Sequence, residues 1–155
     1  MTALWLKFFH LLGVVLMLGN VIVTGFWNFK AVRSRHLAVI AFAQREVMWA
    51  DAVLTLVGGT MITISGIMLA MDRGYPFWAT RWLNGGVFLL GLSTLLWLGV
   101  LLPCQDRLIK LSREALSTGT LSPRFAPVFV VWNVVGWFAT FLLVGALGLM
   151  VVKPL

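Results

Sequence analysis

The chain has little charge of either sign and almost no cysteine. Only 11% of its 155 residues are charged and 61% are hydrophobic, whereas soluble domains are about one-quarter charged. The single cysteine, Cys104, excludes an internal disulfide and any metal site built from several cysteines. The sequence also has no glycine-rich phosphate loop, no zinc triad of histidine and carboxylate, and no nucleophile elbow. The low charge is outside the range of soluble domains, and these common catalytic signatures of soluble enzymes are missing.

Four long apolar runs dominate what is present. They cover about residues 4–29, 47–71, 82–104 and 127–152, and a bilayer core of about 30 Å needs roughly 20 apolar helical residues. Lipid offers no hydrogen-bond partner to the backbone, so each run must be a helix. We therefore predict an all-α polytopic membrane protein in a lipid bilayer. Residues 1–155 form one integral membrane domain, an antiparallel bundle of four transmembrane helices.

The basic residues gather in two of the connections between these runs and give the chain a net charge of +7. Eight of the twelve lie in the connections after the first and third runs, and four lie on the opposite side. The positive-inside rule then places both long connections in the cytoplasm and both termini outside it. Anionic lipid beside these connections explains the positive charge, so we expect no nucleic-acid partner.

The two long connections have helical spacing of apolar residues. Residues 31–46 either extend a span into the cytoplasm or lie along the membrane surface. Residues 105–116 look similar, and Pro103 before them predicts a kink at the end of the third span. Tryptophans are expected at the two membrane interfaces: Trp5, Trp78 and Trp82 outside, and Trp27, Trp49 and Trp132 inside.

Polar residues within the runs are costly in lipid and mark candidate sites. In the first run, steps of three or four place one set on a single helix face that should look into the bundle: His10, Gly13, Met17, Asn20 and Thr24. Lys7 lies one turn before His10 and can reach the outer headgroups. In the second run the same counting gives a face of Asp51, Thr55, Gly58 and Ser65. A neighbouring stripe of Thr55, Gly59 and Thr63 predicts a close helix approach.

These polar residues are expected to form two layers at different depths. His10 falls in the outer part, near Ser65 and Asn84, which opens the third run. Asp51 enters from the cytoplasmic side, where Asn20, Thr24 and Asn133 also lie. At 1.5 Å per residue, His10 and Asp51 differ in depth by roughly 15–20 Å, so they should not pair directly.

Each layer has more than one interpretation. His10 is either a neutral histidine that holds helix register, a haem or metal ligand, or a proton-handling group. Asp51 is best explained as an interfacial carboxylate paired with Arg45 or favoured by the helix dipole. The methionines are expected to pack rather than bind copper.

Several motifs carry a resemblance along nearly the whole chain. They are Leu6-Lys7-Phe8-Phe9-His10 with Gly13 and Gly19, Trp49-Ala50-Asp51, Gly66, Leu96-Trp97-Leu98 before Gln105, and the ending Leu149-Met150-Val151-Val152-Lys153-Pro154. With them the chain resembles an uncharacterised bacterial family of four-helix membrane proteins, domain of unknown function 2269. That family is distantly similar to the copper-resistance D-type membrane proteins and to the J-type protoporphyrinogen oxidases. The resemblance implies a bacterial inner membrane.

The resemblance to the oxidases implies a role for His10, since they are haem-associated and have a histidine in the first span. Their third span carries a lysine close to where Trp82-Leu83-Asn84-Gly85-Gly86 stands here, and this chain has none. Protoporphyrinogen oxidation is therefore not transferred, and what remains is haem b with His10 as ligand. His36 lies in a cytoplasmic connection, so the second ligand would be a methionine, Lys7, water or His10 of a second subunit.

Three functions are compatible with these observations. The first is a haem-linked redox protein that depends on His10. The second is a non-catalytic subunit or scaffold, which would act as a homo-oligomer or with a membrane partner subunit. It is suggested by the small number of residues that could take part in catalysis. The third is a small transporter that uses Asp51 and Asn20, which we rank last because four helices line a pore poorly without oligomerising.

Overall fold

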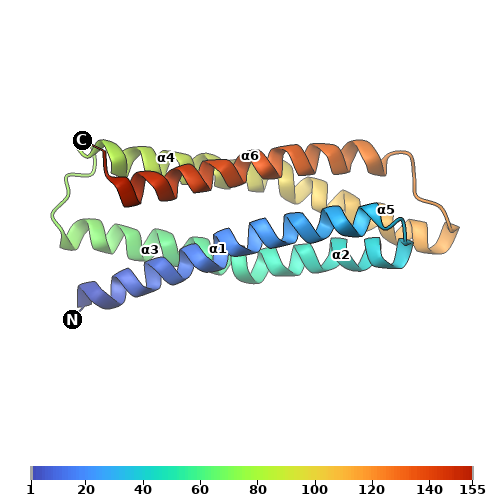
Figure 1. Ribbon diagram of the computed structural model, residues 1–155, viewed down its shortest axis with the longest axis horizontal. Coiled ribbons are helices and arrows are strands. Elements are labelled where there is room, and N and C mark those ends of the chain that lie inside the picture. Colours follow the sequence, from blue (N-terminus) through green and yellow to red (C-terminus); the bar gives the residue numbers. More distant parts are fainter. Residues whose placement is uncertain (1, 155) are drawn as a thin grey trace.

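The computed structural model describes residues 2–154 and shows four long helical rods (Figure 1). The first and last rods are α1 (Thr2–Arg33) and α6 (Phe125–Val152). The second consists of α2 (Leu37–Ala50), the π-helical turn η1 (Asp51–Thr55) and α3 (Leu56–Asp72). The third consists of α4 (Arg81–Leu96), the π-helical turn η2 (Trp97–Leu101) and α5 (Leu102–Thr118).

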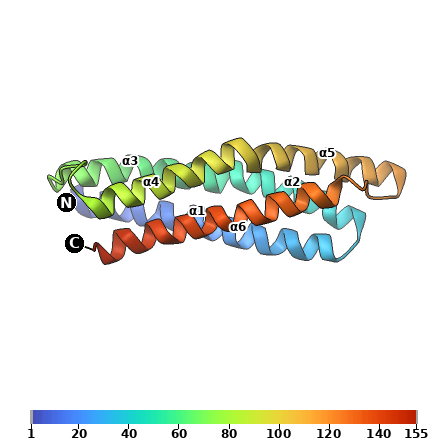
Figure 2. The same cartoon turned by 90° about the horizontal axis from the view of Figure 1, so that it is seen from above.

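All four rods are long and apolar enough to cross a membrane. They are joined by short turns and alternate in direction, and both chain ends lie at the same end of the bundle (Figures 1 and 2). The predicted all-α antiparallel bundle of four membrane-spanning helices is therefore confirmed. We call the end that holds the chain termini the outer end and the opposite one the inner end.

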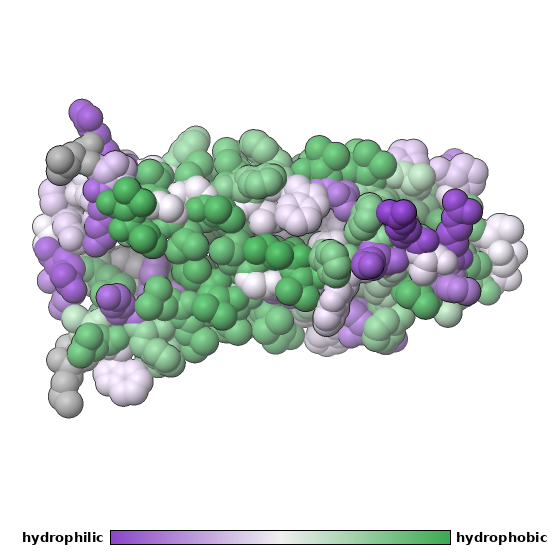
Figure 3. Space-filling view, in the orientation of Figure 1, coloured by the Kyte–Doolittle hydropathy of each residue, from purple (hydrophilic) through white to green (hydrophobic). Residues whose placement is uncertain are grey.

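The second and third rods are longer than the apolar runs predict. They contain 36 and 38 residues, about 54 and 57 Å at 1.5 Å per residue, well beyond a 30 Å bilayer core. Residues 31–46 mostly extend the second span, after a turn in which Arg35 has a φ of 59°. The face seen in Figure 3 is mainly hydrophobic through the outer and middle parts of the bundle, with hydrophilic residues at the outer edge and again toward the inner end. The bundle thus protrudes from the membrane on its inner side.

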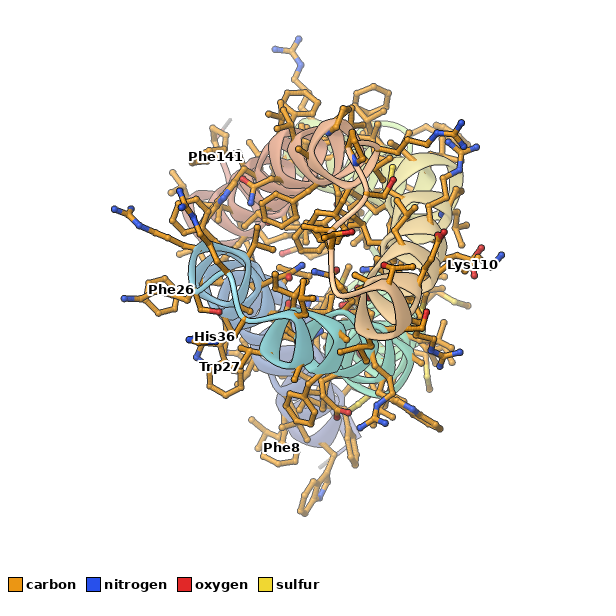
Figure 4. All side chains as sticks on the ribbon, turned by 90° about the vertical axis from the view of Figure 1, so that its right-hand side faces the viewer. Phe8, Phe26, Trp27, His36, Lys110 and Phe141 are labelled. Atoms are coloured by element: carbon orange, nitrogen blue, oxygen red, sulfur yellow. The ribbon has the colours of Figure 1, made fainter. Side chains whose placement is uncertain are left out.

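The protruding end has a packed interior. Ile40, Leu108 and Phe125 are each no more than 1% exposed, whereas Phe26, Trp27 and Lys110 point away from the bundle axis (Figure 4). Between α1 and α2, the Gln44 amide donates to Asn28 Oδ1 at 2.7 Å, and the Asn28 amide donates back to Gln44 Oε1 at 3.4 Å. Both side chains are fully buried, and the pairing gives each amide a hydrogen-bond partner.

The pairing of Asn28 with Gln44 makes a prediction for stability. Asn28→Leu should lower the free energy of unfolding by about 1–3 kcal/mol, because it leaves the buried Gln44 amide without its partner. The double variant Asn28→Leu/Gln44→Leu should recover most of that loss, since both partners are then apolar. Thermal unfolding of the purified variants measures both effects. A double variant less stable than the single one would contradict the pairing.

The outer half divides into two helix pairs. There α1 packs on α3 and α4 packs on α6, while no α-carbons of α3 and α4 approach within 8 Å. The α1–α3 contact is very close: a Cβ added to Gly58 would lie 2.8 Å from the Gly13 carbonyl oxygen. The predicted stripe of Thr55, Gly59 and Thr63 is therefore not the contact line, because Gly59 faces only the end of a flexible side chain and Thr63 is exposed.

Two expectations about the inner interface also change. Trp132 is only 6% exposed and faces the bundle interior rather than the headgroups. Pro103 does follow an irregularity, but the irregularity is the π-helical turn η2 directly before it. A proline cannot donate to the carbonyl one turn back, and a π turn redistributes the hydrogen bonds around that gap.

Candidate ligand-binding cavities

The space between the two helix pairs forms an outer cavity of about 560 Å³. It lies in the outer half, between the α1–α3 pair and the α4–α6 pair seen in Figure 1. Most of its lining is aliphatic, with Val14, Leu83 and Leu147 as examples. Such a volume lies within the range of roughly 300–1,000 Å³ typical of ligand sites.

His10 lines the outer cavity in a fixed orientation. Its Nδ1 lies 3.1 Å from the Ile62 carbonyl oxygen and 3.2 Å from Ser65 Oγ. The Ser65 hydroxyl donates its proton to the Met61 carbonyl oxygen, so it can only accept from the imidazole. Nδ1 must then carry a proton, and when the ring is neutral its lone pair is on Nε2. Metal-ligating histidines are commonly held in this way, and so is a histidine that holds the register of two packed helices.

Gly66 provides the room that the imidazole needs. A Cβ at this position would lie only 3.1 Å from His10 Cε1. The Cε1 and Nδ1 atoms of the ring therefore lie close to the backbone of α3 at Gly66, one turn after the hydrogen-bond acceptor Ile62. The sequence-predicted inward face of α1 is confirmed here, since Gly13, Met17 and Asn20 are buried and His10 is half-buried.

The outer rim of this cavity is cationic. Lys7, Arg73 and Lys153 line it, and among residues 2–154 no aspartate or glutamate does. Lys153 Nζ lies 5.1 Å from the centre of the Trp82 ring and 5.9 Å from that of Tyr75. The two rings meet edge to face at 5.3 Å. An anionic group at the rim would therefore find three positive side chains and a rigid aromatic edge.

An inner cavity of about 330 Å³ adjoins the outer one, since Met17, Thr63, Leu90 and Leu143 line both. Asp51 lies at the inner cavity and is 5% exposed. Its Oδ1 accepts from the Asn20 amide at 2.8 Å and from the Thr55 hydroxyl at 3.1 Å, and its Oδ2 accepts from the Gln105 amide at 2.6 Å. Side chains from α1, η1 and α5 thus converge on one carboxyl group.

The expected pairing of Asp51 with Arg45 is wrong. Arg45 instead pairs with its neighbour Glu46 at 2.9 Å on the exposed surface. Asp51 is also not at a helix N-terminus, because α2 continues through η1 into α3. The sequence could not show that α2 and α3 form one rod, which places Asp51 in its middle.

The two π-helical turns face each other across the inner cavity. Asp51 and Thr55 of η1 line it from one side, and Trp97 and Leu101 of η2 line it from the other. π turns are uncommon and occur often at functional sites, since they re-aim side chains that a regular helix would direct elsewhere. Here they turn the Asp51 carboxyl and the Trp97 indole toward the same space.

The six candidates from the sequence separate into three groups. Lys7 and His10 line the outer cavity, and Asn20 and Asp51 belong to the inner cluster, so the two predicted layers are present and do not touch directly. Asn84 lies in neither: its amide donates to the Trp78 carbonyl oxygen at 3.1 Å and closes the α3–α4 turn. Asn133 is half-buried and lines neither cavity. It was expected near Asp51, and the structure does not place it in that cluster.

Three inner-site residues were not among the candidates from sequence: Gln105, Trp97 and Trp132. Gln105 is 2% exposed and bonds directly to Asp51. The signal for Gln105 was its polar side chain at the inner end of an apolar run, at the depth expected for Asp51. The tryptophans gave no such signal, because a tryptophan at these positions could equally lie at the membrane interface.

Comparison with known proteins places the chain in a family. No curated protein and no solved structure matches it significantly. The family model of DUF2269, described as "Predicted integral membrane protein", matches residues 4–154. This chain therefore belongs to the DUF2269 family of predicted integral membrane proteins.

Proposed function

We propose that the protein binds haem b in its outer cavity, with His10 as an axial ligand, and serves a redox-linked role in the membrane. The observation that carries the proposal is the orientation of His10. Nδ1 is bonded to the Ile62 carbonyl and Ser65 Oγ, and the lone pair of Nε2 is left for a ligand that the adjoining cavity would hold.

The residues present fit such a group. The cavity is large and mainly aliphatic, as a porphyrin face requires. Lys7, Arg73 and Lys153 at the rim would pair with two carboxylates at the polar edge of the ring. Met17 and Met150 line the same cavity and would offer thioether sulfurs to such a group. Among residues 2–154, no three histidine, cysteine, aspartate or glutamate side chains form a metal site of another type.

The roles of the chain's own residues follow from their contacts. His10 would hold the iron, while Ile62 and Ser65 fix the direction of its ring. The aliphatic walls of α1, α3, α4 and α6 would exclude water and favour the less charged oxidation state. A bound haem would supply one-electron transfer, which the side chains here cannot supply themselves.

The test is an absorbance spectrum of the purified protein from cells that make haem, together with chemical haem quantification. The wild type should show a Soret band, and His10→Ala should lose at least nine-tenths of it, because the axial ligand is gone. The matched control is His36→Ala, the other histidine of the chain, which is exposed in the inner turn. It should keep the band. A wild type without haem, or an unchanged band in His10→Ala, would overturn the proposal.

We also propose the bacterial inner membrane as the location, with the inner end in the cytoplasm. Two observations support this orientation. The basic residues of the inner turns and of α5 outnumber those of the outer end, and positive loops stay in the cytoplasm. The cavity rim with Lys7 and Lys153 then opens on the outer face.

The second candidate function is that of a non-catalytic membrane subunit. The protruding inner end favours it, since α5 presents a row of exposed charges beyond the apolar band, including Arg107, Lys110 and Arg113. A stable partner that co-purifies with a haem-free protein would favour this function over the first.

A further inference from the structure

The inner cavity contains three buried polar atoms that lack a hydrogen-bond partner. They are Trp97 Nε1, Trp132 Nε1 and Gln105 Oε1, and within residues 2–154 they are the only such side-chain atoms. All three residues line this one cavity. A buried polar group without a partner costs about 1–3 kcal/mol, so their gathering at one cavity indicates that something else completes them.

The chemistry of the missing partner follows from the three atoms. The two indole nitrogens can only donate, and the amide oxygen can only accept. The Asp51 carboxyl beside them is already engaged by Asn20, Thr55 and Gln105. The Trp97 indole also lies close to this carboxyl, without the geometry of a full hydrogen bond. A hydroxyl group offers two acceptor lone pairs and one donor proton, which is the complement of this set. A carboxylate would lack the proton and would lie beside the Asp51 carboxyl.

The route to the cavity points to the bilayer. Leu56 and Ile64 of α3 line the inner cavity and are 54% and 56% exposed, so the cavity opens on the lipid-facing surface. α3 and α4 make no close contact that would shut this side. Apart from the polar cluster at its inner end, the lining is mainly apolar, with Leu90 and Leu143 as examples. A ligand that enters here would be lipid-soluble, with a polar head and an apolar body.

We propose that the inner cavity binds the head group of a neutral lipid-soluble alcohol or phenol, with Trp97, Trp132 and Gln105 as its hydrogen-bond partners. Two sources share this chemistry: the reduced form of a quinone and an isoprenoid alcohol. The polar groups of this site are different from those of the adjoining His10 cavity, and binding here does not require haem.

The probes are decylubiquinol and geranylgeraniol, each added to purified protein in detergent, with the rise in thermal midpoint as the measure of binding. The methyl ether of geranylgeraniol is the matched control ligand, since it keeps the body and loses the donor proton. Binding of at least one hydroxyl probe, and weaker binding of the ether, is expected. Whichever probe binds more tightly identifies the source, and the lipids extracted from the purified protein check that assignment.

The variants Trp97→Phe and Trp132→Phe remove one donor each and keep an aromatic ring. Each should weaken binding about five- to tenfold, the value of one hydrogen bond. Trp137→Phe is the control on the same helix as Trp132, because Trp137 is 42% exposed to the surroundings; it should bind like the wild type. His10→Ala should also bind normally, which separates this site from the proposed haem site.

Two results would overturn the proposal. One is the absence of a saturable shift with either hydroxyl probe. The other is equal affinity in the wild type, Trp97→Phe and Trp132→Phe. In both cases the three polar atoms would be completed by water alone.

Discussion

Replacing Asp51 with leucine should lower the free energy of unfolding by about 2–6 kcal/mol. The carboxyl group accepts from the Asn20 and Gln105 amides. An apolar side chain would leave each amide with an N–H that has no acceptor, and Asn20 would keep only its bond to Thr55 Oγ1 at 2.9 Å. Each buried amide left unsatisfied costs about 1–3 kcal/mol. Unfolding of the purified variant in mixed micelles, titrated with a denaturing detergent, measures the loss.

Asp51→Asn is the matched control and should stay within about 1 kcal/mol of the wild type. The new amide oxygen can still accept from Asn20 and Thr55, while its NH₂ group would face Gln105. Gln105 can rotate its amide by half a turn and present Oε1, which has no protein partner in the wild type. If Asp51→Asn were as unstable as Asp51→Leu, the negative charge itself would support the fold, and the hydrogen-bond account would be wrong.

Gly58→Ala should separate α1 from α3 and cost about 1–3 kcal/mol, the usual range for overpacking. The added Cβ would lie 2.8 Å from the Gly13 carbonyl oxygen and 2.8 Å from the Met17 backbone nitrogen. Both atoms belong to the backbone of α1, so no side-chain rotation can relieve the clash. The same shift would displace the His10 ring, which bonds to Ile62 one turn farther along α3.

The neighbouring Gly59 provides the control. A Cβ there would lie 3.6 Å from the Met17 sulfur, an ordinary contact with a flexible side chain. Gly59→Ala should therefore be neutral or slightly stabilising, because alanine favours a helix over glycine. The unfolding measurement used for Asp51 compares the two. Equal stability of Gly58→Ala and Gly59→Ala would contradict the close approach of α1 and α3.

The membrane class and the polar faces were predictable from the sequence for simple reasons. Run length and the absence of charge determine a membrane span. Steps of three and four place His10, Met17 and Asn20 on one face whatever the helix packs against. The separation of His10 from Asp51 also followed from the rise per residue alone. Each of these properties is determined within a single helix and does not depend on how the helices pack together.

The parts that could not be predicted depend on how the rods meet. Gly58 and Gly59 are indistinguishable in the sequence, and only the packing of α1 selects Gly58 as the contact. Trp132 has the position of an interfacial residue but faces the core, because α6 runs beside η2 at that depth. The π-helical turns have no reliable sequence signal apart from Pro103, and they decide where Asp51 and Trp97 point.

Four membrane-spanning helices and the proposed orientation together define a topology in which the His10 cavity opens on the outer face. Labelling of single cysteines in a Cys104→Ser background tests it most directly. A membrane-impermeant maleimide should label Trp78→Cys, in the outer turn, in intact cells. Ser34→Cys and Thr118→Cys, at the inner turns, should react only after permeabilisation. Labelling of Ser34→Cys in intact cells, or equal labelling of Trp78→Cys and Thr118→Cys there, would contradict the account.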